Sequence, residues 1–193
     1  MRANSAHYWG VILAGGEGSR LQEFTKHLYG KVRPKQFCVF AGTRSMFRHT
    51  LDRTLMLIPS QRILTVICKQ YLEYATDQVR DVDPRNVVLL PFCKETAASV
   101  LYSLLLISRR DPDAVVALFP SDHFVRDERD FMQHVLAAFD CVRQFQGDLV
   151  VLGVDAGYPE TEYGWVELAD RINWDGGAAL FRVRRFWEKP HEE

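Results

Sequence analysis

The order of apolar runs and amphipathic segments is the feature that most constrains the fold of this chain. Short runs rich in β-branched residues alternate with segments whose apolar residues are spaced three and four apart. The predicted strands are 9–13, 62–68, 86–90, 114–119 and 149–154, and the predicted helices are 46–58, 71–79, 96–109 and one that follows Asp127. This alternation predicts an α/β fold with a doubly wound, mostly parallel, Rossmann-like sheet flanked by helices.

Several of these segments carry more specific expectations. The run 114–119 is apolar throughout, which predicts a strand buried on both faces of the sheet. The helix 96–109 is nearly apolar in its middle, so we expect it to be well buried. Asp127 is predicted to cap the next helix. Residues 14–36 show no helical or alternating pattern, and connections longer than about 15 residues are usually functional.

Three glycines, Gly15, Gly16 and Gly18, follow the first predicted strand within four positions. Without side chains the backbone turns sharply and its N–H groups approach a ligand closely. Arg20 ends this glycine loop and Lys35 lies beyond it. Bare amides beside two cations suit a polyphosphate, and a simple tight turn is the alternative.

Two common glycine-rich motifs do not fit. A dinucleotide fingerprint counted from Gly16 would need glycine at Leu21, and a P-loop would need Lys after Gly18, where the chain has Ser19 and Arg20. Neither an NAD-linked site nor a P-loop is therefore predicted.

Asp122 stands in Pro-Ser-Asp-His, directly after the most apolar predicted strand. A carboxylate at such a strand end suits Mg²⁺, which prefers oxygen ligands and bridges to phosphates. The alternative is an Asp that caps the following turn. In doubly wound sheets ligands bind beyond the carboxyl ends of strands, and the glycine loop, the segment 94–96 and Asp122 all follow predicted strands.

The stretch Leu-Ala-Gly-Gly-Glu-Gly-Ser-Arg-Leu (13–21), followed by Pro-Lys-Gln-Phe (34–37) and Ser-Asp-His (121–123), resembles the signature of the sugar-phosphate nucleotidyltransferases. Its Pro-Lys-Gln-Phe form is most similar to the mannose-1-phosphate guanylyltransferase branch. The resemblance implies an enzyme that uses Mg²⁺ to join a nucleoside triphosphate to a sugar 1-phosphate. GTP and mannose 1-phosphate are the first choice for these two substrates. The open alternative is a non-catalytic regulatory protein of the same fold that binds a nucleotide or nucleotide sugar.

The same resemblance implies roles for individual residues. The implied catalytic residues are Arg20, Lys35 and Asp122, and Asp122 is also the implied metal ligand. The implied nucleotide-binding residues are Leu13, Ala14, Gly15, Gly16, Gly18, Ser19, Glu95 and Thr96. Glu95 departs from the family pattern, and two interpretations stay open: it accepts hydrogen bonds from a guanine, or it starts a helix.

A hairpin is predicted near the end of the chain, from strands 163–169 and 179–187 and a turn at 173–177. The resemblance makes 158–190 the sugar-binding region of one catalytic domain spanning 1–193. Its implied sugar-binding residues are Tyr163, Gly164, Glu188 and Lys189. The sequences of family members extend beyond the matching region and carry a second acidic metal ligand there. The chain therefore resembles the N-terminal part of a longer catalytic domain.

Composition excludes some function classes. The net charge is −1, so no overall basic field attracts nucleic acid or anionic membrane. The apolar run near the N-terminus is shorter than a signal peptide core or a membrane span. Cys38, Cys68, Cys93 and Cys141 form no Cys-x-x-Cys pair, which predicts reduced structural cysteines in a cytoplasmic protein rather than a zinc site. The predicted partners are a nucleoside triphosphate and a sugar 1-phosphate, and self-association stays open.

Overall fold

The computed structural model describes residues 5–92 and 96–190. The chain divides into two compact units, Met1–Met132 and Gln133–Glu193. Both units lie inside the single domain predicted for 1–193, and that domain assignment stays a prediction.

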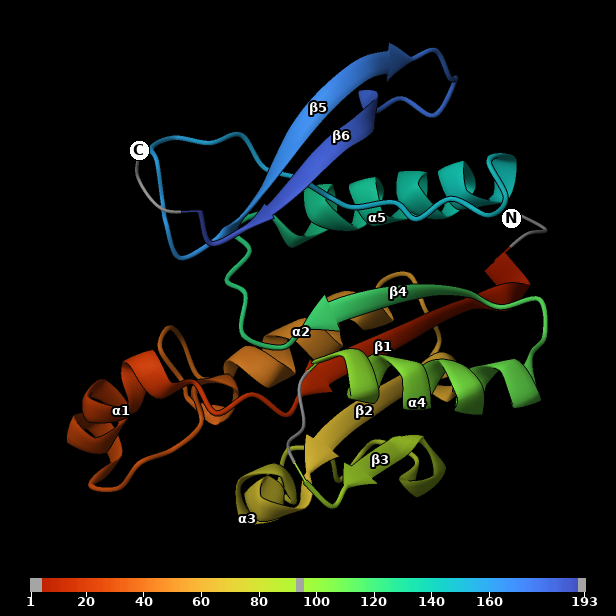
Figure 1. The fold of residues 1–193 in the computed structure, drawn as a ribbon. Coiled ribbons are helices and arrows are strands. Elements are labelled where there is room, and N and C mark those ends of the chain that lie inside the picture. The colour runs from red at the N-terminus through yellow and green to blue at the C-terminus, as the bar shows by residue number, and fades with distance from the viewer. Residues whose placement is uncertain (1–4, 93–95, 191–193) are drawn as a thin grey trace. The chain divides into compact units, whose positions relative to one another are not determined.

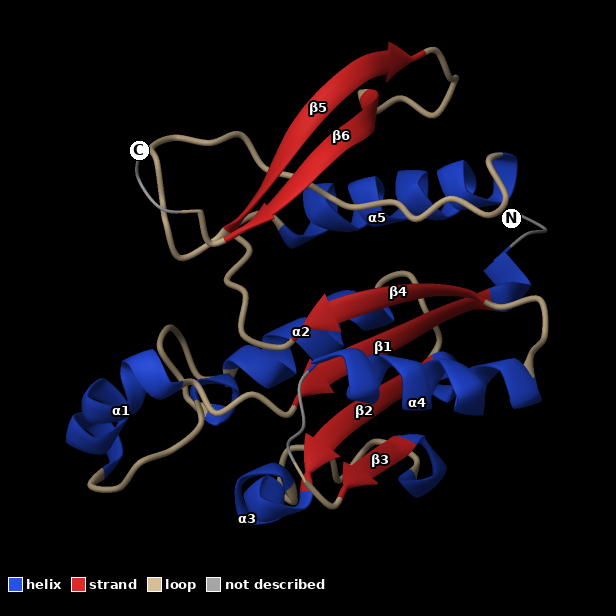
Figure 2. Ribbon diagram, viewed as in Figure 1, coloured by secondary structure: helices blue, strands red, loops and turns tan. Residues whose placement is uncertain are grey.

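The first unit is built on a parallel four-stranded sheet (Figures 1 and 2). Its strands are β1 (Tyr8–Ala14), β2 (Ile63–Cys68), β3 (Val87–Leu90) and β4 (Val115–Pro120), in the spatial order β3-β2-β1-β4. Every pair is parallel, with Val11 of β1 facing Leu64 of β2 and Leu118 of β4 in the register. The predicted α/β class and the parallel sheet are confirmed.

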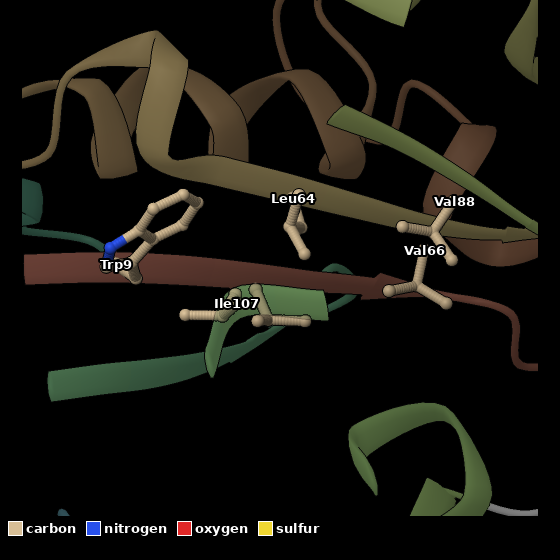
Figure 3. Close-up of a cluster of buried hydrophobic side chains, with 6 residues drawn as sticks. Trp9, Leu64, Val66, Val88 and Ile107 are labelled. Atoms are coloured by element: carbon tan, nitrogen blue, oxygen red, sulfur yellow. The ribbon is translucent and has the colours of Figure 1, made fainter. Parts of the chain in front are cut away.

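Helices cover both faces of this sheet. On one face, Trp9 and Val11 form a buried cluster with residues of β2 and β3 and with Ile107 of α4 (Thr96–Arg110) (Figure 3). On the other face, a Cβ added at Gly10 would lie 3.1 Å from Cγ2 of Thr54 in α2 (Met46–Leu55), so the helix packs directly on the strand backbone. Successive β1 residues thus face different helices, which is the doubly wound arrangement.

Three further helices are α1 (Gln22–Tyr29), α3 (Leu72–Ala75) and α5 (Glu128–Gln144). The expectation that 14–36 has no regular pattern is wrong, because α1 lies within it. Phe24 and Leu28 stand four positions apart, which is the spacing of one helix face, but this apolar face is half exposed and the buried residue is Thr25. Asp127 does cap α5, since its Oδ1 accepts a hydrogen bond from Asp130 N at 2.9 Å.

Two expectations about burial are wrong. In α4, Leu101 and Leu105 are more than half exposed, because the helix turns only the stripe through Ser103 and Ile107 toward the sheet. Leu118 of β4 is 44% exposed, because β4 is an edge strand of the described sheet and pairs only with β1. An apolar sequence therefore does not guarantee burial on every side.

The strand predicted at 149–154 is absent from the part of the chain that the structure describes. These residues have no regular structure, and the side chains of Leu149 and Val154 are 96% exposed. A strand exists only through a backbone ladder with a neighbour, and this segment pairs with no described strand.

The second unit contains the predicted hairpin. Strands β5 (Gly164–Ile172) and β6 (Leu180–Glu188) are antiparallel, and Gly164 pairs with Glu188. Gly177 in the connecting turn has φ 78°, which a glycine adopts without strain. Across the described residues, no helix is both long and apolar enough to cross a membrane.

Candidate functional site

Gln36 fixes the backbone of the glycine loop. Its side chain is 2% exposed, and Nε2 donates hydrogen bonds to the carbonyl oxygens of Ala14, at 3.1 Å, and Gly16, at 2.9 Å. A buried amide that satisfies two loop carbonyls holds the loop in one conformation. Gln36 belongs to the quoted Pro-Lys-Gln-Phe motif, but sequence reasoning assigned it no role.

The segment that carries Lys35 is anchored by aromatic rings. The Arg33 guanidinium carbon lies 4.4 Å from the ring centre of Tyr29 and 5.4 Å from that of Tyr74. The Cys38 thiol donates to the Pro34 carbonyl at 3.5 Å, and burial raises the pKa of this thiol to about 11, with the Arg33 charge acting in the opposite direction. Cys38 therefore stays a neutral hydrogen-bond donor within this turn.

Gly18 brings the loop against Lys35. Gly18 has φ 64°, and a Cβ added there would lie 2.9 Å from Cγ of Lys35. Both the left-handed backbone and the close side chain require glycine at this position. The loop and the Lys35 segment are therefore packed directly against each other.

Ser121 joins the ends of β4 and β1 at the same edge of the sheet. It is 2% exposed, its Oγ donates to the Leu13 carbonyl at 2.6 Å, and its backbone N donates to the same oxygen at 3.2 Å. Asp122 is the next residue, so its backbone is fixed relative to the strand that leads into the glycine loop.

Lys35 and Asp122 meet at this edge. The distance from Lys35 Nζ to Asp122 Oδ2 is 2.5 Å, and the two side chains are 34% and 25% exposed. A partly exposed ion pair of this kind contributes only about 0.2–1 kcal/mol to stability. The ion pair matters because it brings Lys35, the predicted phosphate-binding cation, next to Asp122, the predicted metal ligand.

A cavity of about 400 Å³ opens beside this pair. Its lining includes Leu13, Gly15 and Gly16 of the loop, Thr96 and Ser99 of α4, and Ser121 and Asp122. Predicted nucleotide-binding residues of the glycine loop and Thr96 therefore share one cavity with Asp122, the predicted metal ligand. Its position beyond the carboxyl ends of β1 and β4 is the expected ligand position in a doubly wound sheet.

The other predicted nucleotide-side residues lie elsewhere. Ser19 and Arg20 are exposed in a single 3₁₀ turn, Ser19–Leu21. Ala14 is fully buried, and its carbonyl is the acceptor for Gln36. Glu95 lies outside the described residues, so both interpretations of it stay open.

The four predicted sugar-binding residues gather at one end of the hairpin in the second unit. Gly164 pairs with Glu188, and the Lys189 backbone N donates to the Tyr163 carbonyl at 3.2 Å. Lys189 has φ 46°, a left-handed conformation that is uncommon for a residue with a side chain. All four residues are exposed.

The described residues contain no group of three or more His, Cys, Asp or Glu side chains that could hold a metal ion. Asp122 is a single carboxylate at a cavity rim, which fits an ion that takes the rest of its ligands from phosphate oxygens and water. Cys38 and Cys141 are free and buried, whereas Cys68 is disulfide-bonded, so the expectation of reduced cysteines is wrong for Cys68.

A parallel, doubly wound sheet with a glycine loop, a cation and a carboxylate at its carboxyl edge defines a class of α/β protein suited to nucleotide phosphates. Residues 9–193 match the family model of the nucleotidyl transferases, and the chain belongs to this family.

Relatives within the family are similar over nearly the whole chain. The chain is 30% identical over 184 residues to the alginate biosynthesis protein AlgA of Pseudomonas aeruginosa, covering 94% of this chain and 36% of that protein. It is 30% identical over 186 residues to a mannose-1-phosphate guanylyltransferase of Escherichia coli, covering 95% of this chain and 38% of that one. The chain thus spans little more than a third of the length of these relatives.

Solved structures share the fold. A structure described as a mannose-1-phosphate geranyltransferase from Thermus thermophilus superposes with a TM-score of 0.78 at 27% identity, covering 96% of this chain and 51% of that one. A structure described as a mannose-6-phosphate isomerase from Helicobacter pylori gives a TM-score of 0.67 at 24% identity and supports the fold alone.

Proposed function

We propose that this chain takes part in nucleotidyl transfer from GTP to mannose 1-phosphate, which yields GDP-mannose and pyrophosphate. Membership of the nucleotidyl transferase family supports the reaction class. The name of the Escherichia coli relative supports the choice of guanine nucleotide and mannose 1-phosphate. The observation that carries the proposal is the 2.5 Å contact between Lys35 Nζ and Asp122 Oδ2 at the rim of the glycine-loop cavity.

The cations and the loop are proposed to bind the triphosphate. Lys35 would exchange its partner Asp122 for a phosphate oxygen, and Arg20, exposed at the end of the loop, would contact the same chain of phosphates. Gln36 acts indirectly, because it holds the Ala14 and Gly16 carbonyls and so keeps the loop in shape. The positive charges neutralise the charge that develops on the pyrophosphate leaving group.

Asp122 is proposed to hold Mg²⁺ together with phosphate oxygens. The bound ion would supply charge neutralisation at the reacting phosphate. Asp122 fits this role because its backbone is fixed by Ser121 and its carboxylate lines the cavity.

The chemical step needs no covalent intermediate on the protein. An oxygen of the sugar phosphate forms a bond to the α-phosphorus, the bond from that phosphorus to the bridging oxygen breaks, and pyrophosphate leaves with the electron pair. The sugar phosphate is already an anion, so the chain contributes positioning and charge neutralisation rather than a general base. Tyr163, Gly164, Glu188 and Lys189 are proposed to hold the sugar and its phosphate.

The test is a pyrophosphate-release assay on residues 1–193 with GTP, ATP, CTP and UTP, each combined with mannose 1-phosphate or glucose 1-phosphate. We expect the highest rate with GTP and mannose 1-phosphate. Binding of GTP by calorimetry without any pyrophosphate release would favour the non-catalytic alternative. A chain that neither binds nor turns over any of these triphosphates would refute both.

A further inference from the structure

Arg53 is a buried cation that the proposed chemistry does not use. It lies in α2, and 2% of its surface is exposed. Its Nη2 donates to Thr50 Oγ1 at 2.8 Å and to the His123 carbonyl at 3.3 Å, and Nη1 lies 3.9 Å from Glu128 Oε1. Burial lowers the pKa of the guanidinium, and Glu128 acts in the opposite direction.

The burial of Arg53 is unfavourable for the stability of the fold. In the described part of the chain, Nε and Nη1 are buried without a hydrogen-bond partner. Glu128 and the Phe131 ring, whose centre lies 5.5 Å from the guanidinium carbon, compensate the charge in part. The unmet donors still make this residue less favourable for the fold than an apolar side chain of similar size. The contact that Arg53 does make across the fold, to the backbone of the turn after β4, therefore needs an explanation.

That turn carries Asp122 between two fixed points. On one side, the backbone N and Oγ of Ser121 donate to the Leu13 carbonyl at the end of β1. On the other side, Arg53 holds the His123 carbonyl, whereas the His123 side chain is 68% exposed. The residues on both sides of Asp122 are thus hydrogen-bonded to different elements, Ser121 to β1 and His123 to α2.

The turn also lies between two cavities. Ser121 and Asp122 line the glycine-loop cavity, and His123 and Phe124 line a second cavity of about 540 Å³ together with Arg53 and Glu128. The hydrogen bonds of Ser121 and of the His123 carbonyl hold the backbone of this turn between the two cavities.

We propose that Arg53 is a positioning residue for Asp122, which it holds in the orientation that binds Mg²⁺ with the triphosphate. The inference rests on the proposed function, in which Asp122 is the metal ligand. Arg53 touches neither nucleotide nor metal and acts through the His123 carbonyl. Without this hydrogen bond the turn adopts more conformations. The Asp122 carboxylate is then oriented to bind Mg²⁺ in a smaller fraction of them.

Two threonines of α2 provide a matched test. Thr50 and Thr54 are both fully buried, and each hydroxyl donates to the carbonyl four residues earlier, at 3.1 Å and 2.7 Å. Thr50 Oγ1 also accepts the hydrogen bond from Arg53. Thr50→Val and Thr54→Val therefore lose the same helix contact, and only Thr50→Val also removes the side-chain acceptor that orients Arg53 Nη2 toward the His123 carbonyl.

The measurement is GTP affinity by calorimetry at a series of Mg²⁺ concentrations. For Thr50→Val we expect a rise of about three- to tenfold in the Mg²⁺ concentration that gives half of the maximal increase in GTP affinity. Loss of a residue that contacts a metal ligand directly typically costs about 10–100-fold in metal affinity, and the effect of Thr50 should be smaller because it is less direct. Thr54→Val should match the parent chain. Thr50→Val should melt at a lower temperature than Thr54→Val, because it also removes an acceptor from the buried Arg53 guanidinium. Both variants should show the same GTP affinity without Mg²⁺. Arg53→Lys, which keeps the charge and loses the forked donor, should shift the Mg²⁺ dependence at least as far.

Equal Mg²⁺ dependence in Thr50→Val and Thr54→Val would overturn the inference. Asp122→Asn separates this outcome from a failure of the proposed function. If Asp122→Asn abolishes the Mg²⁺ enhancement while Thr50→Val leaves it unchanged, only the role of Arg53 is wrong. If the parent chain shows no Mg²⁺ enhancement, or Asp122→Asn retains it, the role of Asp122 and that of Arg53 both fail.

Discussion

The glycine-loop site of the first unit and the end of the β5–β6 hairpin in the second unit are held together by different kinds of contact. Gln36 and Ser121 are both 2% exposed, and their hydrogen bonds join residues 22 and 108 positions apart. The four proposed sugar-binding residues are exposed and are brought together by the local ladder of one hairpin. The proposed nucleotide site therefore depends on buried contacts between distant segments, whereas the proposed sugar site depends on the backbone pairing of a single hairpin.

Among the substitutions in the two regions, we expect the largest effect on activity at Asp122. We expect Asp122→Asn to lower turnover by about 100-fold or more, the range seen when one charge-stabilising group is removed. The melting temperature should stay within a few degrees, because the partly exposed pair with Lys35 contributes at most about 1 kcal/mol. Pyrophosphate release and thermal melting measure the two effects.

Asp77→Asn is the matched control for Asp122→Asn. Asp77 forms an exposed ion pair with Arg80 at 2.6 Å and takes no part in the site, so its turnover should equal that of the parent chain. Equal turnover of Asp122→Asn and the parent chain would show that this carboxylate binds no catalytic metal.

The two proposed phosphate-binding cations are next in expected effect. Lys35→Ala and Arg20→Ala should each weaken GTP binding by about 1.5–3 kcal/mol, because each removes a charge-assisted hydrogen bond. Calorimetry measures the affinity, and Lys31→Ala is the control, since Lys31 lies in the same connection but pairs with Glu73 at 3.7 Å. Unchanged affinity in both site variants would refute the phosphate role.

Gln36→Met tests whether buried contacts shape the nucleotide site. The variant keeps the volume but leaves two loop carbonyls without their donor, and each buried unsatisfied group costs about 1–3 kcal/mol. We expect a lower free energy of unfolding in denaturant titration together with weaker GTP binding. The exposed Gln61→Met should change neither quantity. A stable Gln36→Met chain with full GTP affinity would mean that the loop holds its shape unaided.

The hairpin should give the smallest effects on nucleotide binding. The double variant Glu188→Ala/Lys189→Ala should raise the KM for the sugar phosphate and leave the GTP Kd within about threefold, less than 1 kcal/mol. The reason is that both residues are exposed and lie in the second unit. Glu167→Ala/Arg184→Ala removes an ion pair of 3.2 Å within the same hairpin and is the control. If GTP binding collapses in Glu188→Ala/Lys189→Ala alone, these residues belong to the nucleotide site instead.

Several parts of the fold could be predicted because their signals are local. The β-branched run before the glycine loop, the glycines themselves and the turn residues of the hairpin each restrict their own backbone, and β1, the loop and β5–β6 follow. Asp122 could be predicted because a polar residue stands directly after an apolar strand. The helix α1 was not predicted, because its 8 residues hold only one pair of apolar side chains at helical spacing, Phe24 and Leu28.

Other parts depended on neighbours that no local pattern specifies. The run 114–119 is apolar whether its strand is central or at an edge, and only the strand order places β4 at the edge. The run 149–154 has the composition of a strand, yet a strand also needs a partner, and it has none among the described residues. Gln36, Ser121 and Arg53 are ordinary polar residues in sequence, and their roles follow from what they contact.

The sequence by itself determined the class of fold and the chemistry available at its carboxyl edge, because backbone preference and side-chain charge belong to individual residues and their near neighbours. The tertiary structure decided which groups meet: Lys35 with Asp122, Gln36 with two loop carbonyls, Arg53 with the turn that carries Asp122. These contacts join segments far apart in the chain, and packing of the whole sheet and its helices sets their distances.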